Sequence, residues 1–405
     1  MNLKSVLFVS MLLASTASLA GGYQLQEYSV TNAGRAFAGA GIVGDDYSAI
    51  AFNPAGMTLK KSGVQIGGMA MDIHSNMHGT LSDGTTGDKG KLRNFKMIPH
   101  GFMQYALSEN WRAGLGLYVP FGLGTYYNKS WFGRSHAITS EIETIDINPS
   151  LAWKPFSWLS IGGGYIFERM EARLTNTIGS NGYSDMNADG WGHGWNAGIM
   201  VEPAKTTRFG VGYRSPVVQN IKGKHHLKHP LAGMREGISS TKLVDPEHIQ
   251  FTAYQELGKW GLSAMARWTR WSRFHLLSID STALAPLGAS PSQVDENWRN
   301  TWTFSGGVDY KYCNNLTLRT GLAYDQGAVK DAGHRTARVP DNNRWIASIG
   351  ATYMKNNWQF DLSYFHMFWQ KAAVDSKANR TGTTYIRGKY ETQINSIGLG
   401  VQYHF

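Results

Sequence analysis

Few residues in this sequence have the types and spacing that enzyme or metal chemistry requires. The run Lys224-His225-His226-Leu227-Lys228-His229 gathers imidazoles, but it lacks the fixed spacing to cysteines or carboxylates that a zinc site shows. No Gly-x-Ser-x-Gly motif marks a hydrolase nucleophile, and no nucleotide-binding motif occurs. We therefore predict a protein that is not an enzyme and that binds no cofactor or metal. Cys313 is the single cysteine and is expected to be a stray thiol.

A conformational break is the first candidate functional feature. Pro120 cannot donate a ladder hydrogen bond and Gly122 packs no side chain, so the run Pro120-Phe121-Gly122-Leu123-Gly124 predicts a break or bulge after residues 112–119. An equally good interpretation is that a strand simply turns into a loop at this point. The residues alone leave both interpretations open.

The elements around this break show the hydrophobic period of two that β-strands have. Large apolar residues alternate with small or polar ones in 301–310, 316–325 and 396–405. After residue 20 no run of eighteen apolar residues occurs, so a closed barrel is the structure that can satisfy its backbone in lipid. The 14 tryptophans and 19 tyrosines fit the aromatic girdles of such barrels. Weaker alternation brings the expected total to about fourteen strands, over 63–73, 99–107, 111–119, 140–153, 158–174, 191–202, 206–215, 247–257, 260–271, 344–354 and 357–368.

Short turns and long polar connections alternate along the chain, as they do in outer-membrane barrels. Short turns are expected at 108–110, 154–157, 203–205, 258–259, 311–315 and 355–357. Long external loops are expected near 74–98, 120–139, 175–190, 216–246, 272–299, 326–343 and 369–391. This topology predicts an all-β transmembrane antiparallel barrel in the outer membrane of a Gram-negative cell, with both termini in the periplasm. The chain ends on Phe405 after a regular strand, which resembles the signature read by the barrel-assembly machinery.

The N-terminal part of the chain differs from the rest. Lys4, an apolar run and small residues up to Ala20 predict a signal peptide over 1–20. Residues 21–62 do not alternate and are rich in glycine and alanine, so we expect a hatch, or plug, inside the lumen of a barrel that covers 63–405. A disordered periplasmic extension is the alternative for 21–62.

The charge of the chain indicates which partners to expect. The formal net charge is +10, and basic residues such as Lys222, Lys224 and Lys228 cluster in an expected external loop. Such a loop could be merely solvated or could contact anionic lipopolysaccharide. Nucleic acid is not an expected partner, because a secreted chain does not meet it.

Several motifs together resemble the FadL family of long-chain fatty acid transporters. Near the predicted mature N-terminus they are Gly22-Tyr23-Gln24-Leu25-x-Glu27, Gly34 to Gly39, Asp45-Asp46 and Asn53-Pro54-Ala55. Further along they are Trp191 to Gly198, Gly212 to Ser215, Arg319 to Asp325 and Val339-Pro340-Asp341-x-x-Arg344-Trp345. The resemblance implies a monomeric barrel of fourteen strands with an N-terminal hatch. It also implies capture of an apolar ligand from outside and its release sideways through a gap at a kinked third strand.

The same resemblance assigns roles to individual residues. It makes Asn53, Pro54 and Ala55 a hatch element beside the gap, although as a bare tripeptide they are only a turn signal. It makes Pro120 and Gly122 the kink of the third strand. Tyr23 and Phe121 become candidates for contact with the ligand.

A fatty acid also needs a cation for its carboxylate. Position against the family favours Arg169 first and Arg299 second, and no lysine here matches the family's lumenal lysine. Arg169 shares strand parity with Ile161 and Tyr165, which should face lipid, so a bulge or the end of the membrane zone would have to intervene. An arginine at the outer rim, paired with Glu171, is the alternative interpretation.

These expectations favour uptake of long-chain fatty acids or similar hydrophobic molecules. An aromatic hydrocarbon is the rival ligand, especially if the carboxylate clamp is absent. A general porin is disfavoured because a plugged lumen should not pass polar solutes, and a role as adhesin or phage receptor could coexist through the external loops.

Overall fold

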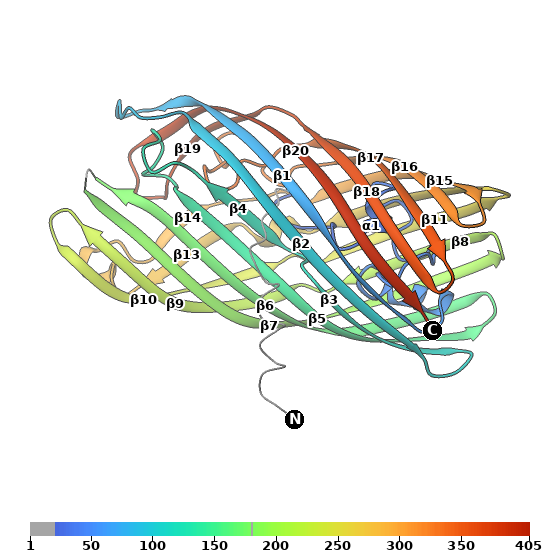
Figure 1. Cartoon of the computed structure of the whole chain (residues 1–405). Coiled ribbons are helices and arrows are strands. Elements are labelled where there is room, and N and C mark those ends of the chain that lie inside the picture. The colour runs from blue at the N-terminus through green and yellow to red at the C-terminus, as the bar shows by residue number, and fades with distance from the viewer. Residues whose placement is uncertain (1–20, 180) are drawn as a thin grey trace, which may run out of the picture.

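The structure, a computed structural model, describes residues 21–179 and 181–405, which form a closed antiparallel β-barrel (Figure 1). The predicted signal peptide lies outside the described residues. The strands cross the wall fourteen times, because several crossings consist of two strands in series. The prediction of about fourteen strands is thus confirmed. The strands are β1 (Gly63–Leu81), β2 (Gly90–Ala106), β3 (Trp111–Tyr118), β4 (Gly122–Tyr126), β5 (Thr139–Phe156), β6 (Leu159–Ile178), β7 (Gly182–Ala204), β8 (Thr207–Arg214), β9 (Val217–His229), β10 (Gly233–Asp245), β11 (His248–Leu257), β12 (Trp260–Thr269), β13 (Leu276–Ser281), β14 (Ser292–Asp295), β15 (Thr301–Cys313), β16 (Leu316–Asp325), β17 (Arg344–Lys355), β18 (Trp358–Trp369), β19 (Ala372–Lys377) and β20 (Tyr385–His404).

The first and last strands close the barrel. β1 pairs with β20 from Gly63 opposite His404 to Leu81 opposite Ile386, and its other edge pairs with β2. A closed sheet leaves no row of unpaired backbone groups facing lipid, which is what a wall in a membrane requires. None of the helices among the described residues is long and apolar enough to cross a membrane.

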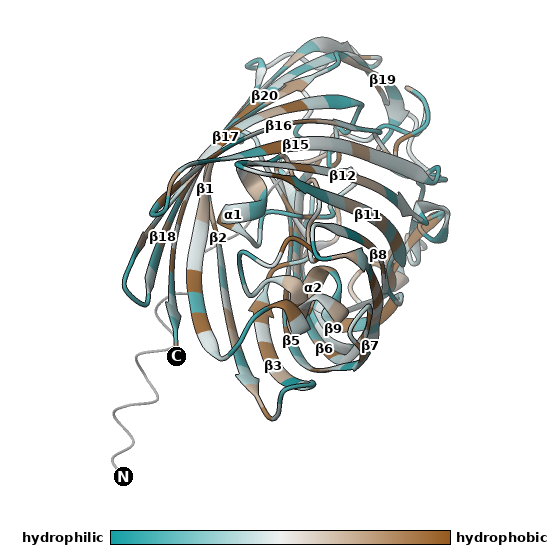
Figure 2. Cartoon of the chain, turned by 90° about the vertical axis from the view of Figure 1, so that its right-hand side faces the viewer, coloured by the Kyte–Doolittle hydropathy of each residue, from teal (hydrophilic) through white to brown (hydrophobic). Residues whose placement is uncertain are grey.

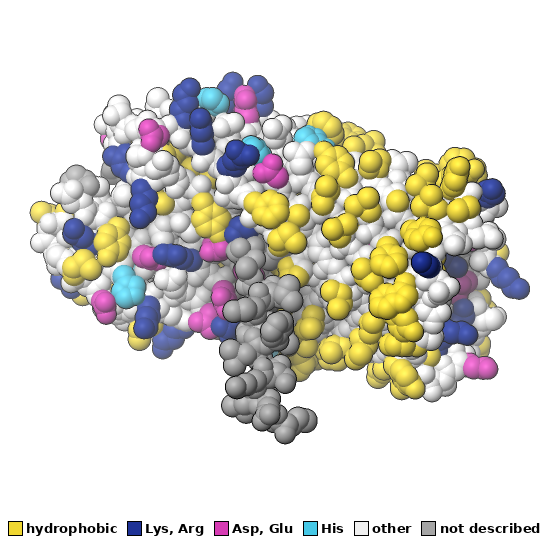
Figure 3. Space-filling model, in the orientation of Figure 1, with side chains coloured by type: hydrophobic (Ala, Val, Ile, Leu, Met, Phe, Trp, Pro, Cys, Tyr) yellow, Lys and Arg dark blue, Asp and Glu magenta, His cyan; other side chains and the backbone are white. Residues whose placement is uncertain are grey.

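The alternation predicted from the sequence runs with its apolar side outward. Leu399 is 64% exposed and Ile349 60%, while the polar side chains of Ser396 and Ser348 are buried. Figure 3 shows these outward hydrophobic side chains gathered over the part of the barrel nearer the C-terminus, with charged side chains mostly beyond them. The wall is therefore apolar where lipid would contact it and polar above that band.

The strands are longer than their hydrophobic pattern predicts. β1 continues to Leu81, β7 begins at Gly182, and the expected loop 216–246 is mostly the hairpin of β9 and β10. The polar segments expected as long external loops at 74–98, 175–190, 216–246 and 369–391 therefore consist in large part of strand extensions. Beyond the lipid band an outward-facing position can be polar, so the strand continues while its hydrophobic period disappears.

The N-terminal segment 21–62 lies inside the barrel. It contains the short helices α1 (Val30–Ala33) and α2 (Ala49–Phe52) and the 3-10 helix η2 (Pro54–Leu59), and both α-helices lie within the ring of strands (Figure 2). Ser29 caps α1 by accepting a hydrogen bond from the backbone N–H of Asn32 at 3.0 Å. Most of its side chains are buried against inward-facing residues of the wall. The two remaining short helices, η3 (Trp271–Arg273) and η4 (Ala285–Leu287), belong to the connections around β13.

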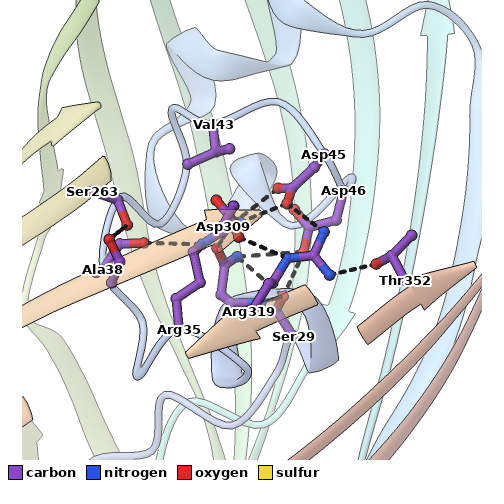
Figure 4. A network of polar contacts seen from close by, with 12 residues as sticks. Ser29, Arg35, Ala38, Val43, Asp45, Asp46, Ser263, Asp309, Arg319 and Thr352 are labelled. Atoms are coloured by element: carbon purple, nitrogen blue, oxygen red, sulfur yellow. Dashed lines mark hydrogen bonds and ion pairs between the residues drawn. The ribbon is translucent and has the colours of Figure 1, made fainter. Parts of the chain in front are cut away.

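Alternating charges fasten this segment to the wall (Figure 4). Arg35 lies 2.6 Å from Asp45 within the segment and 3.2 Å from Asp309 of β15. Arg319 of β16 lies 3.1 Å from both of these carboxylates. Burial alone would raise the pKa of Asp45, but the two guanidiniums hold it well below its ordinary value. Each of these four charges thus faces two of opposite sign, and removing one would leave the others incompletely compensated.

Candidate functional site

The wall is interrupted where β3 ends. β3 pairs with β2 only up to Leu117, which lies opposite Gly101, and β4 pairs with β5 from Gly122 opposite Glu143. Among the described residues, β2 has no ladder partner on this side between Gly90 and His100. Pro120 lies in the break itself. The ladder is therefore interrupted between β3 and β4, and the part of Pro120 and Gly122 in ligand release stays a prediction.

Side chains take the place of the missing ladder between β2 and β4. The amide of Asn94 donates to the carbonyl oxygen of Gly124 at 2.9 Å, and Lys96 Nζ donates to the hydroxyl of Tyr126 at 3.0 Å. Pro99 lies in the unpaired stretch of β2, where a residue without an N–H sacrifices no ladder bond on this side. Contacts of this kind open more easily than a continuous ladder.

Residues of the N-terminal segment cover the break from inside. The N–H of Leu25 donates to the carbonyl of Pro120 at 2.7 Å, and the N–H of Gly122 donates to the carbonyl of Tyr23 at 2.8 Å. Gln24 and Phe121 form an isolated antiparallel bridge. A Cβ on Gly122 would lie 3.0 Å from Leu25 Cδ1, so glycine suits this close approach. The structure thus brings together four predicted residues, Tyr23, Pro120, Phe121 and Gly122.

Aromatic rings pack around Tyr23. Its ring centroid lies 5.8 Å from Phe121, 4.9 Å from Trp271 and 5.8 Å from Trp298, and Phe274 is 6.1 Å away. The contacts with Phe121, Trp271 and Phe274 are edge-to-face, an arrangement that aromatic pairs prefer. A displacement of Tyr23 would therefore reach Phe121 and the break.

Tyr23 and Phe274 also line a mainly apolar chamber, and a larger outer cavity adjoins it. The chamber has a volume of about 50 Å³ and the outer cavity about 300 Å³. Leu174, Leu277, Ile279 and Arg338 line both. Other chamber side chains include Tyr23, Leu123, Ile142, Ile221, Leu243, Phe274, Glu296 and Val339. Pockets for small ligands commonly measure about 300–1,000 Å³, so the outer cavity could hold a ligand and the chamber would have to widen.

Arg338 and Glu296 are the charged residues that line the chamber in the described part of the chain. Arg338 donates to Ser140 Oγ at 3.0 Å and to Asn176 Oδ1 at 3.3 Å. Burial lowers the pKa of Arg338 to about 10, while Glu296 acts in the opposite direction, so the side chain is a cation at neutral pH. Burial raises the pKa of Glu296 to about 7, although a hydrogen bond from Trp298 Nε1 at 2.9 Å favours its charged form.

The two arginines expected to hold a carboxylate lie elsewhere. Arg169 is on the outward side of β6, where it pairs with Glu171 at 3.0 Å and Asp189 at 3.2 Å and lies over the ring of Trp191. No bulge intervenes to turn it inward, so strand parity points it away from the chamber. Arg299 is exposed and donates to the carbonyl of Gly327 at 3.0 Å. Neither side chain lines the chamber or the outer cavity.

The tripeptide Asn53-Pro54-Ala55 contacts the wall at β6 and β7. Asn53 Oδ1 accepts from the N–H of Ala55 at 3.1 Å, and Asn53 Nδ2 donates to the carbonyl of Ile199 at 3.1 Å. A Cβ on Gly162 would lie 2.5 Å from the carbonyl carbon of Pro54, so the wall approaches closely here. Its part in gating stays a prediction.

Comparison with known proteins settles the family. Residues 11–405 match the model of the family described as outer membrane protein transport protein (OMPP1/FadL/TodX). The chain belongs to this family. The resemblance seen in the sequence is confirmed, and the apolar band of the barrel fits the outer-membrane location of the family.

Individual FadL-family relatives are similar over most of their length. The chain is 27% identical to the long-chain fatty acid transport protein of Salmonella typhi, over 90% of this chain and 91% of the relative. It is 25% identical to outer membrane protein P1 of Haemophilus influenzae, over 99% of each. A Pseudomonas aeruginosa FadL homologue shares the fold with a TM-score of 0.86 at 24% identity, over 95% of this chain and 100% of that structure. The Ralstonia pickettii toluene transporter TbuX has a TM-score of 0.70 at 16% identity, over 94% and 99%.

Sequence reasoning missed Arg338 and Glu296. Arg338 immediately precedes Val339-Pro340-Asp341, one of the motifs that carried the FadL resemblance, so that motif was the available signal. Both residues belong to irregular connections, where no hydrophobic period tells which side chains point inward. Among the described residues, no group of three or more histidine, cysteine, aspartate or glutamate side chains could hold a metal ion.

Proposed function

We propose that this protein carries long-chain fatty acids across the outer membrane. The ligand would enter the outer cavity, place its carboxylate against Arg338 and insert its hydrocarbon chain into the apolar chamber. The observation that carries the proposal is that Arg338 lines both cavities and is the one cation among the described residues that line the mainly apolar chamber. Relatives named as long-chain fatty acid transport proteins, which match 90% of this chain, support the same ligand class.

The two parts of the site would contribute different energies. A tail of ~16 methylenes gains on the order of 13 kcal/mol on leaving water, at ~0.8 kcal/mol each. Ordering of the tail and of the protein removes much of this gain. Arg338 adds a charge-assisted hydrogen bond that orients the head group and distinguishes a carboxylate from a neutral molecule.

We further propose that the ligand leaves sideways, between β2 and β4. The N-terminal segment occupies the lumen, and among the described residues the edge of β2 that faces β4 has no ladder partner from Gly90 to His100. A ligand that widens the chamber would press on Tyr23, whose backbone and ring are bound to Gly122 and Phe121. Movement of Tyr23 would loosen the inner cover of the break, and an apolar molecule would then pass into the membrane without crossing the periplasm.

An aromatic hydrocarbon is the rival ligand within this class. A molecule without a carboxylate would leave Arg338 without a ligand partner, so the chamber favours the acid. In cells that lack the protein's gene, we expect wild-type expression to restore uptake of radiolabelled oleate far more than uptake of toluene. If oleate uptake does not depend on the protein, the proposal fails, and dependence of toluene uptake alone would establish the rival.

A further inference from the structure

The chamber is lined by a carboxylic acid, Glu296, as well as by the cation Arg338. Glu296 is 3% exposed, and it lines the same cavity as Arg338. One carboxylate oxygen accepts from Trp298 Nε1 at 2.9 Å, which fixes the side chain in place. The backbone N–H of Glu296 donates to the carbonyl of His275 at 3.0 Å. The carboxyl group therefore has little freedom to swing out of the chamber.

The charge balance of the chamber depends on this carboxyl group. When Glu296 is ionised, its charge and that of Arg338 cancel. An anionic head group would then add a net negative charge to a buried apolar space, which is strongly unfavourable. When Glu296 is neutral, one arginine faces one anion and the charges balance.

We propose that the chamber takes up one proton from solvent with each anionic ligand, and that the Glu296 carboxyl group holds this proton. The inference rests on the proposed function, because it concerns the same chamber and the same ligand class. The outer cavity shares Arg338 with the chamber and gives the proton its route. Capture of a fatty acid is then electroneutral, and neutral amphiphiles such as long-chain alcohols bind without a proton.

The other titratable groups near the chamber do not share the position of Glu296. Asp245 and Glu168 are buried and act electrostatically on Tyr23, but neither lines the chamber. Asp295 is next in the chain but lies half exposed, in an ion pair with Arg380 at 2.5 Å. Burial raises the pKa of the Tyr23 hydroxyl well above its ordinary value, so it remains neutral. Arg338 stays a cation from pH 6 to 8.5, because its pKa is about 10.

The sign of the pH dependence follows from linkage. Burial raises the pKa of Glu296 to about 7, so the group is mostly neutral below pH 7 and ionised above it. A bound anion favours the neutral form and raises this pKa further. Affinity for an anion should therefore be constant at low pH and fall as pH rises above 7, by up to about tenfold per pH unit for one linked proton.

The test uses purified full-length mature protein and 1-hexadecanesulfonate, which stays ionised throughout the range, with 1-hexadecanol as the neutral probe. Binding is measured by calorimetry from pH 6 to 8.5, in two buffers of different ionisation heat, so that proton uptake is counted directly. Wild type should take up between half a proton and one proton per sulfonate at pH 7.5, and none with the alcohol. Glu296→Gln keeps the acceptor for Trp298 and should bind the sulfonate with no proton uptake and no pH dependence. Asp295→Asn is the matched control and should behave as wild type.

Two results would overturn the inference while leaving the proposed function intact. One is sulfonate binding to wild type without proton uptake, and the other is equal uptake by wild type and Glu296→Gln. If neither the sulfonate nor the alcohol binds the wild type at any pH, the proposed function itself is wrong and this inference falls with it.

Discussion

Replacement of Arg338 by methionine tests the proposed head-group contact most directly. Methionine retains an unbranched apolar side chain of similar length but cannot donate a hydrogen bond or carry a charge. In the structure Arg338 already donates to Ser140 and Asn176, so the barrel positions it before any ligand arrives. Both partners also line the outer cavity or the chamber and keep access to water or ligand when the arginine is removed.

The expected loss of oleate affinity can be estimated from the burial of Arg338, which would contact the carboxylate of the ligand. A hydrogen bond to a charged group contributes about 1.5–3 kcal/mol, which corresponds to a roughly 10- to 150-fold change in affinity. Arg338 is half-buried rather than fully buried, which favours the lower half of that range. We therefore expect Arg338→Met to weaken oleate binding about 10- to 40-fold at pH 6.5.

The assay compares oleate with oleyl alcohol on purified protein. Binding of the alcohol should change less than threefold, because it does not depend on the charge of Arg338. Arg338→Lys should retain an intermediate affinity for oleate, since it keeps the charge but loses the planar fork of donors. Arg299→Met is the matched control and should bind both ligands as wild type does, because Arg299 lies outside the chamber. Equal losses for oleate and oleyl alcohol in Arg338→Met would show that the side chain shapes the chamber and does not recognise a carboxylate.

Three further predictions concern the break and the N-terminal segment. In a Cys313→Ser background, a disulfide between Asn94→Cys and Gly124→Cys should join β2 to β4 and abolish oleate uptake by cells, with recovery after reduction; uptake that persists in the oxidised protein would exclude exit at this place. Gly122→Ala should slow oleate uptake because its Cβ would lie 3.0 Å from Leu25, whereas Gly306→Ala, which meets nothing within 4 Å, should not; equal rates in the two variants would remove the argument from close approach. Arg35→Met should destabilise the attachment of the N-terminal segment by about 3–5 kcal/mol and raise single-channel conductance in planar bilayers, with the outward-facing Arg169→Met as control; an unchanged conductance would show that the charge network does not keep the lumen closed.

The sequence was sufficient for the wall of the barrel. Segments such as 301–310 and 396–405 alternate between lipid and lumen, and two-residue periodicity is a local property that needs no knowledge of neighbours. The sequence was insufficient for the parts of strands beyond the lipid, where outward-facing residues need not be apolar. The hairpin of β9 and β10 continues beyond lipid with polar outward side chains such as Lys222 and Lys224, and polar residues in a strand resemble polar residues in a loop.

For the site, too, sequence predicted the features that depend on local chemistry and missed those that depend on contacts between distant segments. Pro120 and Gly122 predict a break from their own backbone chemistry, and the parity of Arg169 with Ile161 and Tyr165 correctly places that side chain outside. The ring contact between Tyr23 and Phe121, and the presence of Glu296 and Arg338 in one chamber, are visible only in the fold. These residues lie far apart in the chain and belong to irregular segments, so their meeting depends on how the barrel closes and where the N-terminal segment lies within it. Local sequence determined which residues face lipid, and tertiary structure decided which charged residues share the chamber, because a chamber is formed by side chains from many distant segments at once.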